Sequence, residues 1–201
     1  MSSLFNLIIL ILSVVIHEVA HGVAALSQGD RTAQYQGRLT LNPIKHLDPF
    51  GSVILPLMFA LLPGSLMFGW AKPVPYNPYN LKNGRKSEFL VAFAGPLSNL
   101  LVAFLGAMAI RVFGDILPNA TLAIISSTIL INIVLALFNL VPLPPLDGSK
   151  ILLNILPFQS SQTVARFYAS YGLIATLFFI FFVWQYFVPV IVLIYKVLLG
   201  V

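Results

Sequence analysis

The chain contains few charged residues and no cysteine. Only 8% of its 201 residues are charged and 59% are hydrophobic, whereas a soluble domain usually carries about 25% charged residues. A chain this apolar cannot cover a water-facing surface, so we expect lipid to be its solvent. The absence of cysteine excludes disulfides and thiolate metal sites.

Charge of either sign is sparse, but basic residues outnumber acidic ones. The eleven Lys and Arg give a net charge of +5, and no four of them are consecutive. In an apolar chain we interpret them as topology signals and contacts with lipid headgroups. The partners expected from composition are therefore the lipid bilayer and not a nucleic acid.

What the chain has instead is a series of long apolar segments. They lie at about residues 4–26, 52–70, 89–113, 120–141 and 167–188, with a further apolar stretch to 201. About 20 apolar residues suffice for one helical crossing. The sequence predicts an all-α polytopic membrane protein with about 4–6 transmembrane segments, forming a single integral membrane domain over residues 1–201.

Two regions depart from this pattern. Residues 32–41 alternate polar and apolar side chains around Gly37, which predicts a short β-hairpin after the first helix. Residues 52–70 are apolar but carry Pro63-Gly64 at their middle, a suitable point for reversal. We expect this second segment to be re-entrant or hairpin-like, although a simple crossing is also possible.

The first apolar segment contains the sequence His17-Glu18-Val19-Ala20-His21. Residues four apart lie on one face of a helix, so the two imidazoles can bind one metal ion, while Glu18 is placed to act as a base on a water molecule. A charged group inside an apolar span costs at least about 2.5–3.5 kcal/mol, which favours a functional role over a structural one.

A catalytic zinc ion needs a third protein ligand and an open position. Asp147 is the preferred candidate, because it follows a turn containing Pro142, Pro144 and Pro145 that cannot remain helical, and because Gly148 permits a close backbone approach. His46 is the second candidate, although it could equally bond to backbone at the base of the expected hairpin. The other acidic residues are interpreted as solvated charges at helix ends and in loops.

Four motifs together resemble the site-2 protease family of intramembrane zinc metalloproteases: HEVAHG at 17–22, NPIKHLDPFG at 42–51, AGPLSN at 94–99 and NLVPLPPLDG at 139–148. The resemblance extends over about residues 5–157 and implies a minimal form without a PDZ domain. It further implies that His17, His21 and Asp147 bind one Zn²⁺ per chain and that Glu18 is the base. Asn139 is implied to contact the substrate or the developing oxyanion.

The function that the resemblance implies is hydrolysis of peptide bonds in or near transmembrane segments of substrate proteins, as in regulated intramembrane proteolysis. The metalloprotease core is expected at about residues 4–157, followed by C-terminal helices at 160–201. Two alternatives remain open, a membrane metal-ion carrier and an inactive protease-like scaffold. A carrier usually needs a string of polar sites along a path, whereas here the polar residues cluster at one depth. The sequence leaves the substrate's identity and the oligomeric state undetermined.

A shared metal ion also constrains topology. His17 and Asp147 must lie at one depth, so segments 4–26 and 120–141 must cross in the same direction and segment 89–113 in the opposite one. Loops 28–50 and 71–88 and the region after Asp147 carry nine of the eleven basic residues. The positive-inside rule places them in the cytoplasm. We therefore expect a multi-pass protein of the cell membrane whose active site opens toward the cytoplasm.

Overall fold

The computed structural model describes residues 3–48 and 72–200. All regular elements within these two ranges are helices. They are α1 (Ser3–Ser27), α2 (Thr32–Tyr35), η1 (Pro43–His46), η3 (Pro78–Asn80), α4 (Arg85–Phe113), α5 (Asn119–Leu140), α6 (Asp147–Ile155), α7 (Phe158–Phe178), η4 (Phe179–Val183), η5 (Trp184–Phe187) and α8 (Val188–Leu199).

Four helical stretches are long and apolar enough to cross a membrane. They are Leu4–Ser27, Arg85–Phe113, Asn119–Leu140 and Phe158–Leu199. The prediction of a multi-pass all-α membrane protein is thereby confirmed. The predicted segment 52–70, with the question of whether it spans or re-enters, lies outside the described residues.

The prediction of a β-hairpin at residues 32–41 is wrong. The Asp30 carboxylate accepts hydrogen bonds from the Thr32 backbone N–H at 3.1 Å and the Thr32 hydroxyl at 2.6 Å, which favours the start of a helical turn. Gly37 then ends α2 with φ +61°, as glycine does at helix C-termini. The polar–apolar alternation reflects a single turn of helix with Ala33 buried and Tyr35 exposed.

The last apolar helix begins earlier than predicted. The sequence predicts a span near residues 167–188, but α7 starts at Phe158 and continues through η4 and η5 into α8. Polar residues in the sequence FQSSQTVAR mask the first turns of α7 in a hydropathy pattern. Pro189 lies in the first turn of α8, where its missing N–H leaves no helical hydrogen bond unmade.

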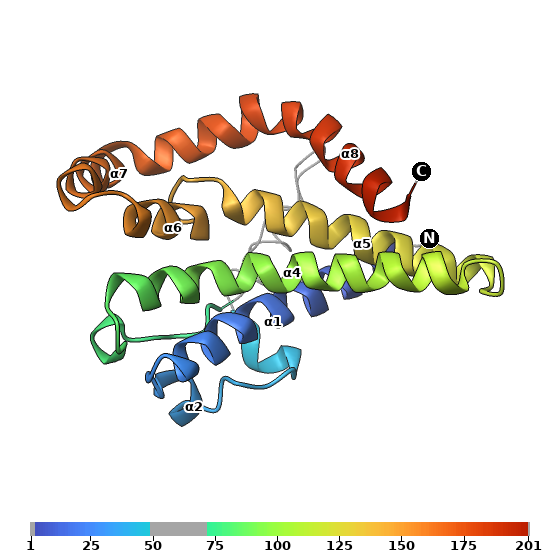
Figure 1. Ribbon diagram of the computed structural model, residues 1–201, viewed down its shortest axis with the longest axis horizontal. Coiled ribbons are helices and arrows are strands. Elements are labelled where there is room, and N and C mark those ends of the chain that lie inside the picture. Colours follow the sequence, from blue (N-terminus) through green and yellow to red (C-terminus); the bar gives the residue numbers. More distant parts are fainter. Residues whose placement is uncertain (1–2, 49–71, 201) are drawn as a thin grey trace.

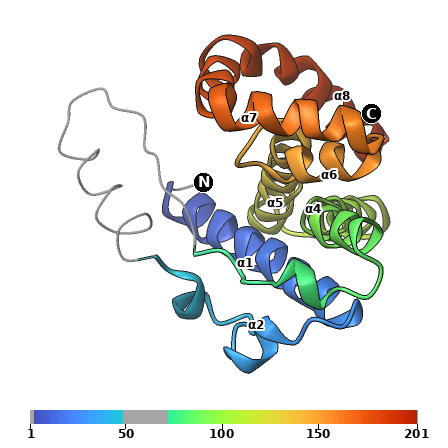
Figure 2. The ribbon, with the colours of Figure 1, turned by 90° about the vertical axis from the view of Figure 1, so that its left-hand side faces the viewer.

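Helices α1, α4 and α5 lie side by side, and α7 to α8 form an outer layer over α5 and α6 (Figures 1 and 2). Figure 1 shows that α1 and α5 run in the same direction and that α4 runs in the opposite one, as the shared-metal argument predicts. Between α4, α5 and α8 an apolar core is formed by Ala103, Ala107, Ile129, Ile133 and Ile191. The small residues of α4 allow α5 to approach closely.

Candidate metal centre

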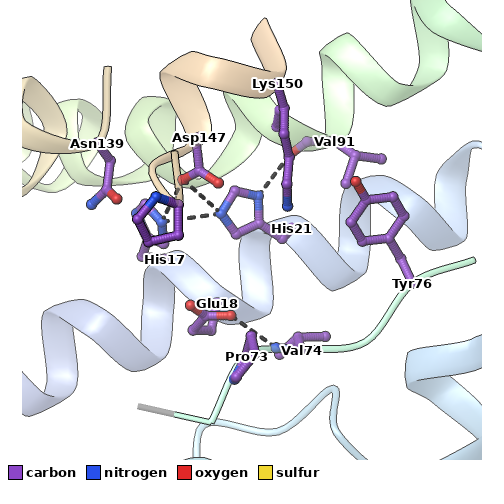
Figure 3. Close-up of a pocket in the computed structure, with 12 residues that line it drawn as sticks. His17, Glu18, His21, Pro73, Val74, Tyr76, Val91, Asn139, Asp147 and Lys150 are labelled. Atoms are coloured by element: carbon purple, nitrogen blue, oxygen red, sulfur yellow. Dashed lines mark hydrogen bonds and ion pairs between the residues drawn. The ribbon is translucent and has the colours of Figure 1, made fainter. Parts of the chain in front are cut away.

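Three side chains that the sequence singles out converge at one point between α1 and α6 (Figure 3). The Nε2 atoms of His17 and His21 lie 3.0 Å apart. The Oδ2 atom of Asp147 lies 3.1 Å from the first and 3.2 Å from the second. Together these residues form a group that could hold a metal ion, with ligand atoms within 4.8 Å of one another.

The hydrogen bonds on the far side of each imidazole decide what the near side can bind. His17 Nδ1 lies 2.6 Å from Asn99 Oδ1, and His21 Nδ1 lies 2.7 Å from the Val91 carbonyl oxygen. Both partners are acceptors, so each ring carries its proton on Nδ1 and directs the lone pair of Nε2 inward. Two nitrogen lone pairs and a carboxylate oxygen that face one another repel each other, and a cation between them would remove this repulsion. Two imidazoles and one carboxylate are a ligand set that suits a catalytic zinc ion.

Gly95 of α4 leaves the space that the two imidazoles occupy. A Cβ atom at this position would lie 2.4 Å from His21 Nε2 and 2.6 Å from His17 Nε2, closer than atoms in van der Waals contact can lie. The AGPLSN motif therefore brings α4 against the ligand side of α1. The sequence predicts close helix approach at this motif but not that the metal centre uses it.

Asp147 reaches the centre because a proline-rich turn separates α5 from α6. Asp147 begins α6, where the helix dipole favours a negative charge. A Cβ atom at Gly148 would lie 2.3 Å from the carbonyl oxygens of Leu140 and Val141. Only a glycine permits this closely packed turn, in agreement with the expected close backbone approach.

Glu18 is held by the main chain of a segment that the sequence did not assign to the site. Its Oε2 atom accepts a hydrogen bond from the Val74 N–H at 2.9 Å (Figure 3). Val74 belongs to an extended segment, residues 72–77, which we call the strap. No pattern of residue types could have revealed this contact, because the donor is a backbone amide.

The strap is anchored at both of its ends. The Lys72 N–H donates to the His46 carbonyl oxygen at 2.8 Å, and the Asn77 N–H donates to Asp30 Oδ2 at 2.7 Å. Asp30 is 1% exposed and also accepts from Asn80 Nδ2 at 2.9 Å. Burial opposes the charged form of Asp30, but hydrogen bonds from Thr32, Asn80 and Asn77 outweigh it and hold the pKa below its usual range.

The proposed ligands, Glu18 and Asn139 all line one cavity of about 160 Å³. Its full lining consists of His17, Glu18, His21, Pro73, Val74, Tyr76, Val91, Ala92, Asn139, Pro145, Asp147 and Lys150. Asn139 donates from Nδ2 to the Leu135 carbonyl oxygen at 3.0 Å. One of its amide hydrogens is therefore used within α5, which leaves the other for a ligand in the cavity.

His46, the second candidate for the third ligand, lies outside this cluster. Its side chain is 1% exposed and its Nε2 atom bonds to the Thr40 carbonyl oxygen at 2.8 Å. It is absent from the group that could hold a metal ion. Its backbone carbonyl receives the strap, so His46 has the backbone-bonded role that the sequence left open.

Tyr76 and Lys150 line the cavity but escaped the sequence analysis. The Lys150 ammonium lies 5.3 Å from the centroid of the Tyr76 ring, within cation–π range. Burial, followed by the charges of Glu88 and Asp147, raises the pKa of Tyr76 to about 12. The available signal was the position of Lys150 one turn after Asp147, on the same face of a helix.

Comparison with known proteins identifies the family. The sequence matches peptidase family M50 over residues 5–115 and 106–183. It is 43% identical to the putative zinc metalloprotease YwhC of Bacillus subtilis over 182 residues, which is 86% of this chain and 78% of that protein. It is 31% identical to the putative zinc metalloprotease Rip2 of Mycobacterium tuberculosis over 138 residues, 69% of this chain and 52% of Rip2. The matched region thus spans about half the length of Rip2. No solved structure matches the chain significantly.

These matches identify the metal implied by the donor set. Family M50 and relatives named as zinc metalloproteases imply Zn²⁺, which agrees with the two imidazoles and one carboxylate at the centre. The family match includes the helix that carries His17 and His21, and also the turn that carries Asp147. The chain therefore belongs to peptidase family M50, the site-2 protease family.

Proposed function

We propose that this protein is an intramembrane zinc metalloendopeptidase that cleaves peptide bonds in or near transmembrane segments of substrate proteins. The observation that supports it most is the convergence of the two imidazoles and the Asp147 carboxylate, with ligand atoms within 4.8 Å of one another. In this proposal His17, His21 and Asp147 hold one zinc ion per chain, within a single membrane domain over residues 1–201. The metalloprotease core is residues 4–157, and helices at 160–201 follow it.

Zinc bound at this centre would lower the pKa of a water molecule and polarise the carbonyl group of the peptide. Glu18 accepts a proton from water as the water oxygen attacks the carbonyl carbon. It then delivers that proton to the amine nitrogen as the C–N bond breaks. The Val74 N–H, 2.9 Å from Oε2, holds the carboxylate in place.

Asn139 is proposed to act on the substrate side of the cavity. Its side chain lines the same cavity as Glu18 and Asp147. With one amide hydrogen bonded to Leu135, the other is available to the substrate or to the oxyanion that develops on the carbonyl oxygen. Loss of one such donor typically costs about 3–4 kcal/mol in the barrier.

A transmembrane substrate must unwind before it can react, because a helix uses its carbonyl groups in internal hydrogen bonds. The cavity has polar groups from α1, α5, α6 and the strap around it, so it can receive both an unwound segment and water. We propose that the chain is a multi-pass protein of the cell membrane and that the cavity opens toward the cytoplasm. The loops on the cavity's side of the membrane carry nine of the eleven basic residues, and basic loops remain in the cytoplasm.

The test compares four purified proteins in liposomes with single-span substrates: wild type, Glu18→Gln, His17→Ala and Asp147→Ala. We expect the wild type to contain one zinc ion and to cleave. Glu18→Gln should retain the zinc ion and lose at least about 100-fold in rate, because the general base is absent. The two ligand variants should lose both zinc and cleavage.

Each outcome separates one assignment from another. Cleavage at the wild-type rate by Glu18→Gln would show that another group is the base. Wild-type zinc content in Asp147→Ala would remove Asp147 from the ligand set. Zinc movement across the liposome membrane without any cleavage would favour a metal-ion carrier, and zinc binding with neither activity would favour a protease-like scaffold. His46→Ala serves as a control that should retain its zinc ion.

A further inference from the structure

A chain of buried polar side chains lies where α1, α4 and α5 meet, behind the metal centre. Asn99 and Asn132 are 0% exposed and Ser13 is 3% exposed. All three belong to helices that are long and apolar enough to cross a membrane. Polar groups at such a depth are expensive unless every donor and acceptor finds a partner. The hydrogen bonds among these three polar side chains therefore indicate what role they have.

The two asparagine amides can be oriented without ambiguity. Asn132 Nδ2 lies 2.9 Å from the Thr128 carbonyl oxygen and 2.9 Å from Ser13 Oγ. A backbone carbonyl accepts only, so this end of the Asn132 amide must be its nitrogen. Asn132 Oδ1 consequently faces Asn99 and accepts from Asn99 Nδ2 at 2.8 Å.

This orientation fixes the amide of Asn99 in turn. Its nitrogen donates to Asn132 Oδ1 and, at 3.4 Å, to the Ser13 carbonyl oxygen. Its oxygen then faces His17 Nδ1 at 2.6 Å. Rotation of either amide by 180° would oppose two donors or two acceptors at several contacts. The hydrogen-bonded side chains of Ser13, Asn132 and Asn99 thus present an acceptor, Asn99 Oδ1, to His17.

We propose that Asn99, oriented by Asn132 and Ser13, is a positioning residue that keeps His17 in its Nδ1–H tautomer for zinc binding. The inference rests on the proposed assignment of His17 as a zinc ligand. The neutral ring has one proton, and only the Nδ1–H tautomer leaves Nε2 free to bind a metal ion. His21 has the equivalent support from the backbone carbonyl of Val91 at 2.7 Å, so the two ligands are oriented by different means.

The competing explanation is that the network only holds three helices together. In that case zinc affinity should follow fold stability in every variant. If Asn99 sets the tautomer, the two quantities separate, because zinc affinity then depends on an acceptor at His17 Nδ1 and stability depends on the whole network. Variants at position 99 can therefore change fold stability without changing zinc affinity.

The experiment measures zinc affinity by chelator competition, and thermal unfolding of the metal-free protein, in detergent. Asn99→Leu removes the acceptor and should weaken zinc binding by about 10–100-fold. Asn99→Asp retains an oxygen acceptor and creates the carboxylate–histidine pair common behind zinc ligands, so its zinc affinity should stay near the wild-type value. Its melting temperature should nevertheless fall, because the donor to Asn132 is lost.

Ser98→Ala is the matched control on the same helix. Ser98 Oγ donates to the Gly95 carbonyl oxygen at 2.7 Å and has no hydrogen bond to His17. This variant should lose a little stability and bind zinc as the wild type does. The nitrogen-15 NMR resonance of His17 Nδ1–H in zinc-loaded protein supplies a direct readout. The Nδ1 proton of His17 should exchange slowly with solvent in the wild type and in Asn99→Asp. It should exchange faster in Asn99→Leu.

Two results would overturn the inference: wild-type zinc affinity in Asn99→Leu, or equal losses in Asn99→Leu and Asn99→Asp. Either result leaves the proposed function intact as long as the wild type binds zinc. Failure of the wild type to bind zinc in the same assay would instead remove the metal assignment itself.

Discussion

The helices around the metal centre and the C-terminal helices serve different physical purposes. Of the 18 residues that form the apolar part of α4, 33% are buried inside the protein. In the stretch from α7 to α8 the corresponding share is only 11%. The cavity receives residues from α1, α4, α5, α6 and the strap, and none of its lining residues comes from the C-terminal stretch. The candidate site therefore lies among the more closely packed helices, and the C-terminal stretch is mostly exposed.

The two regions meet at the proline-rich turn before Asp147. Thr176 Oγ1 donates to the Pro144 carbonyl oxygen at 2.5 Å, and the Tyr168 hydroxyl donates to the Pro142 carbonyl oxygen at 2.5 Å. The outer layer thus holds the backbone that positions one proposed ligand. If this division is correct, substitutions in the inner helices should change zinc binding more than substitutions in the outer layer do.

The largest effect is expected from Gly95→Ala. The added Cβ would lie 2.4 Å from His21 Nε2, and because a ring at the end of a side chain can move more easily than two helices can, the imidazoles should be displaced. Displacement of the imidazoles should weaken zinc binding by about 100-fold, as much as the loss of a group that orients a metal ligand can cost. Zinc content after dialysis against a weak chelator measures it.

Gly106→Ala is the control for this substitution. Gly106 lies on the same helix, and its Cβ would meet an apolar side-chain atom, Ile129 Cγ1, at 2.9 Å. We expect normal zinc content and a modest change in stability. Equal loss of zinc from both variants would indicate that α4 responds as a whole and that Gly95 has no particular relation to the imidazoles.

An intermediate effect is expected from Asp30→Asn at the end of α1. An amide offers one acceptor oxygen in place of the two that bind Thr32, Asn77 and Asn80, so the free energy of unfolding should fall by about 2–3 kcal/mol. Denaturant unfolding in detergent measures it. Zinc affinity should fall less than in Gly95→Ala, because the strap contacts Glu18 and not the proposed ligands.

The same residue predicts how the two regions respond to acid. The pKa of Asp30 is lowered in the folded protein, so its contribution to stability is present above its unfolded pKa and is lost as the pH falls below about 4. Residues 158–199 contain no Asp or Glu. Hydrogen exchange should therefore rise in the strap before it rises in α7 as the pH is lowered. The difference should disappear in Asp30→Asn.

The smallest effect is expected from Gly172→Ala in the outer layer. Its Cβ would lie 2.5 Å from Pro144 Cγ, so the proline-rich turn or α7 must shift, at a cost of about 1–2 kcal/mol in unfolding free energy. Zinc affinity should weaken only slightly. Leu173→Ala, at a residue that is 69% exposed, should change neither quantity. A large loss of zinc from Gly172→Ala would contradict the division into two regions.

The sequence was most informative where a local pattern specifies geometry. The spacing of His17 and His21 places both rings on one helical face, and long apolar runs identify three of the four candidate spans closely. Asp147 was predictable because a proline-rich turn and Gly148 mark an unusual backbone. Each of these signals lies within a few residues along the chain, where covalent geometry and helix periodicity determine what can happen.

The sequence was least informative where contacts join distant segments through the backbone. The hairpin prediction failed because one carboxylate, Asp30, begins a helical turn two residues later. The contact between Glu18 and the Val74 amide leaves no trace in residue types. Asn99 was visible within a motif, but its relation to His17 depends on the register of α4 against α1, which neither helix specifies alone.

The separation of the proposed ligands along the chain has a consequence for biosynthesis. Asp147 lies 126 residues after His21, so a growing chain that has inserted α1, α4 and most of α5 still lacks one of the three donor atoms. An intermediate in which Asp147 has not yet been made or inserted cannot assemble the centre, because one of the three proposed ligands is absent. In the proposed assignment, a bound ion would join α1, the first helix of the core, to α6, its last.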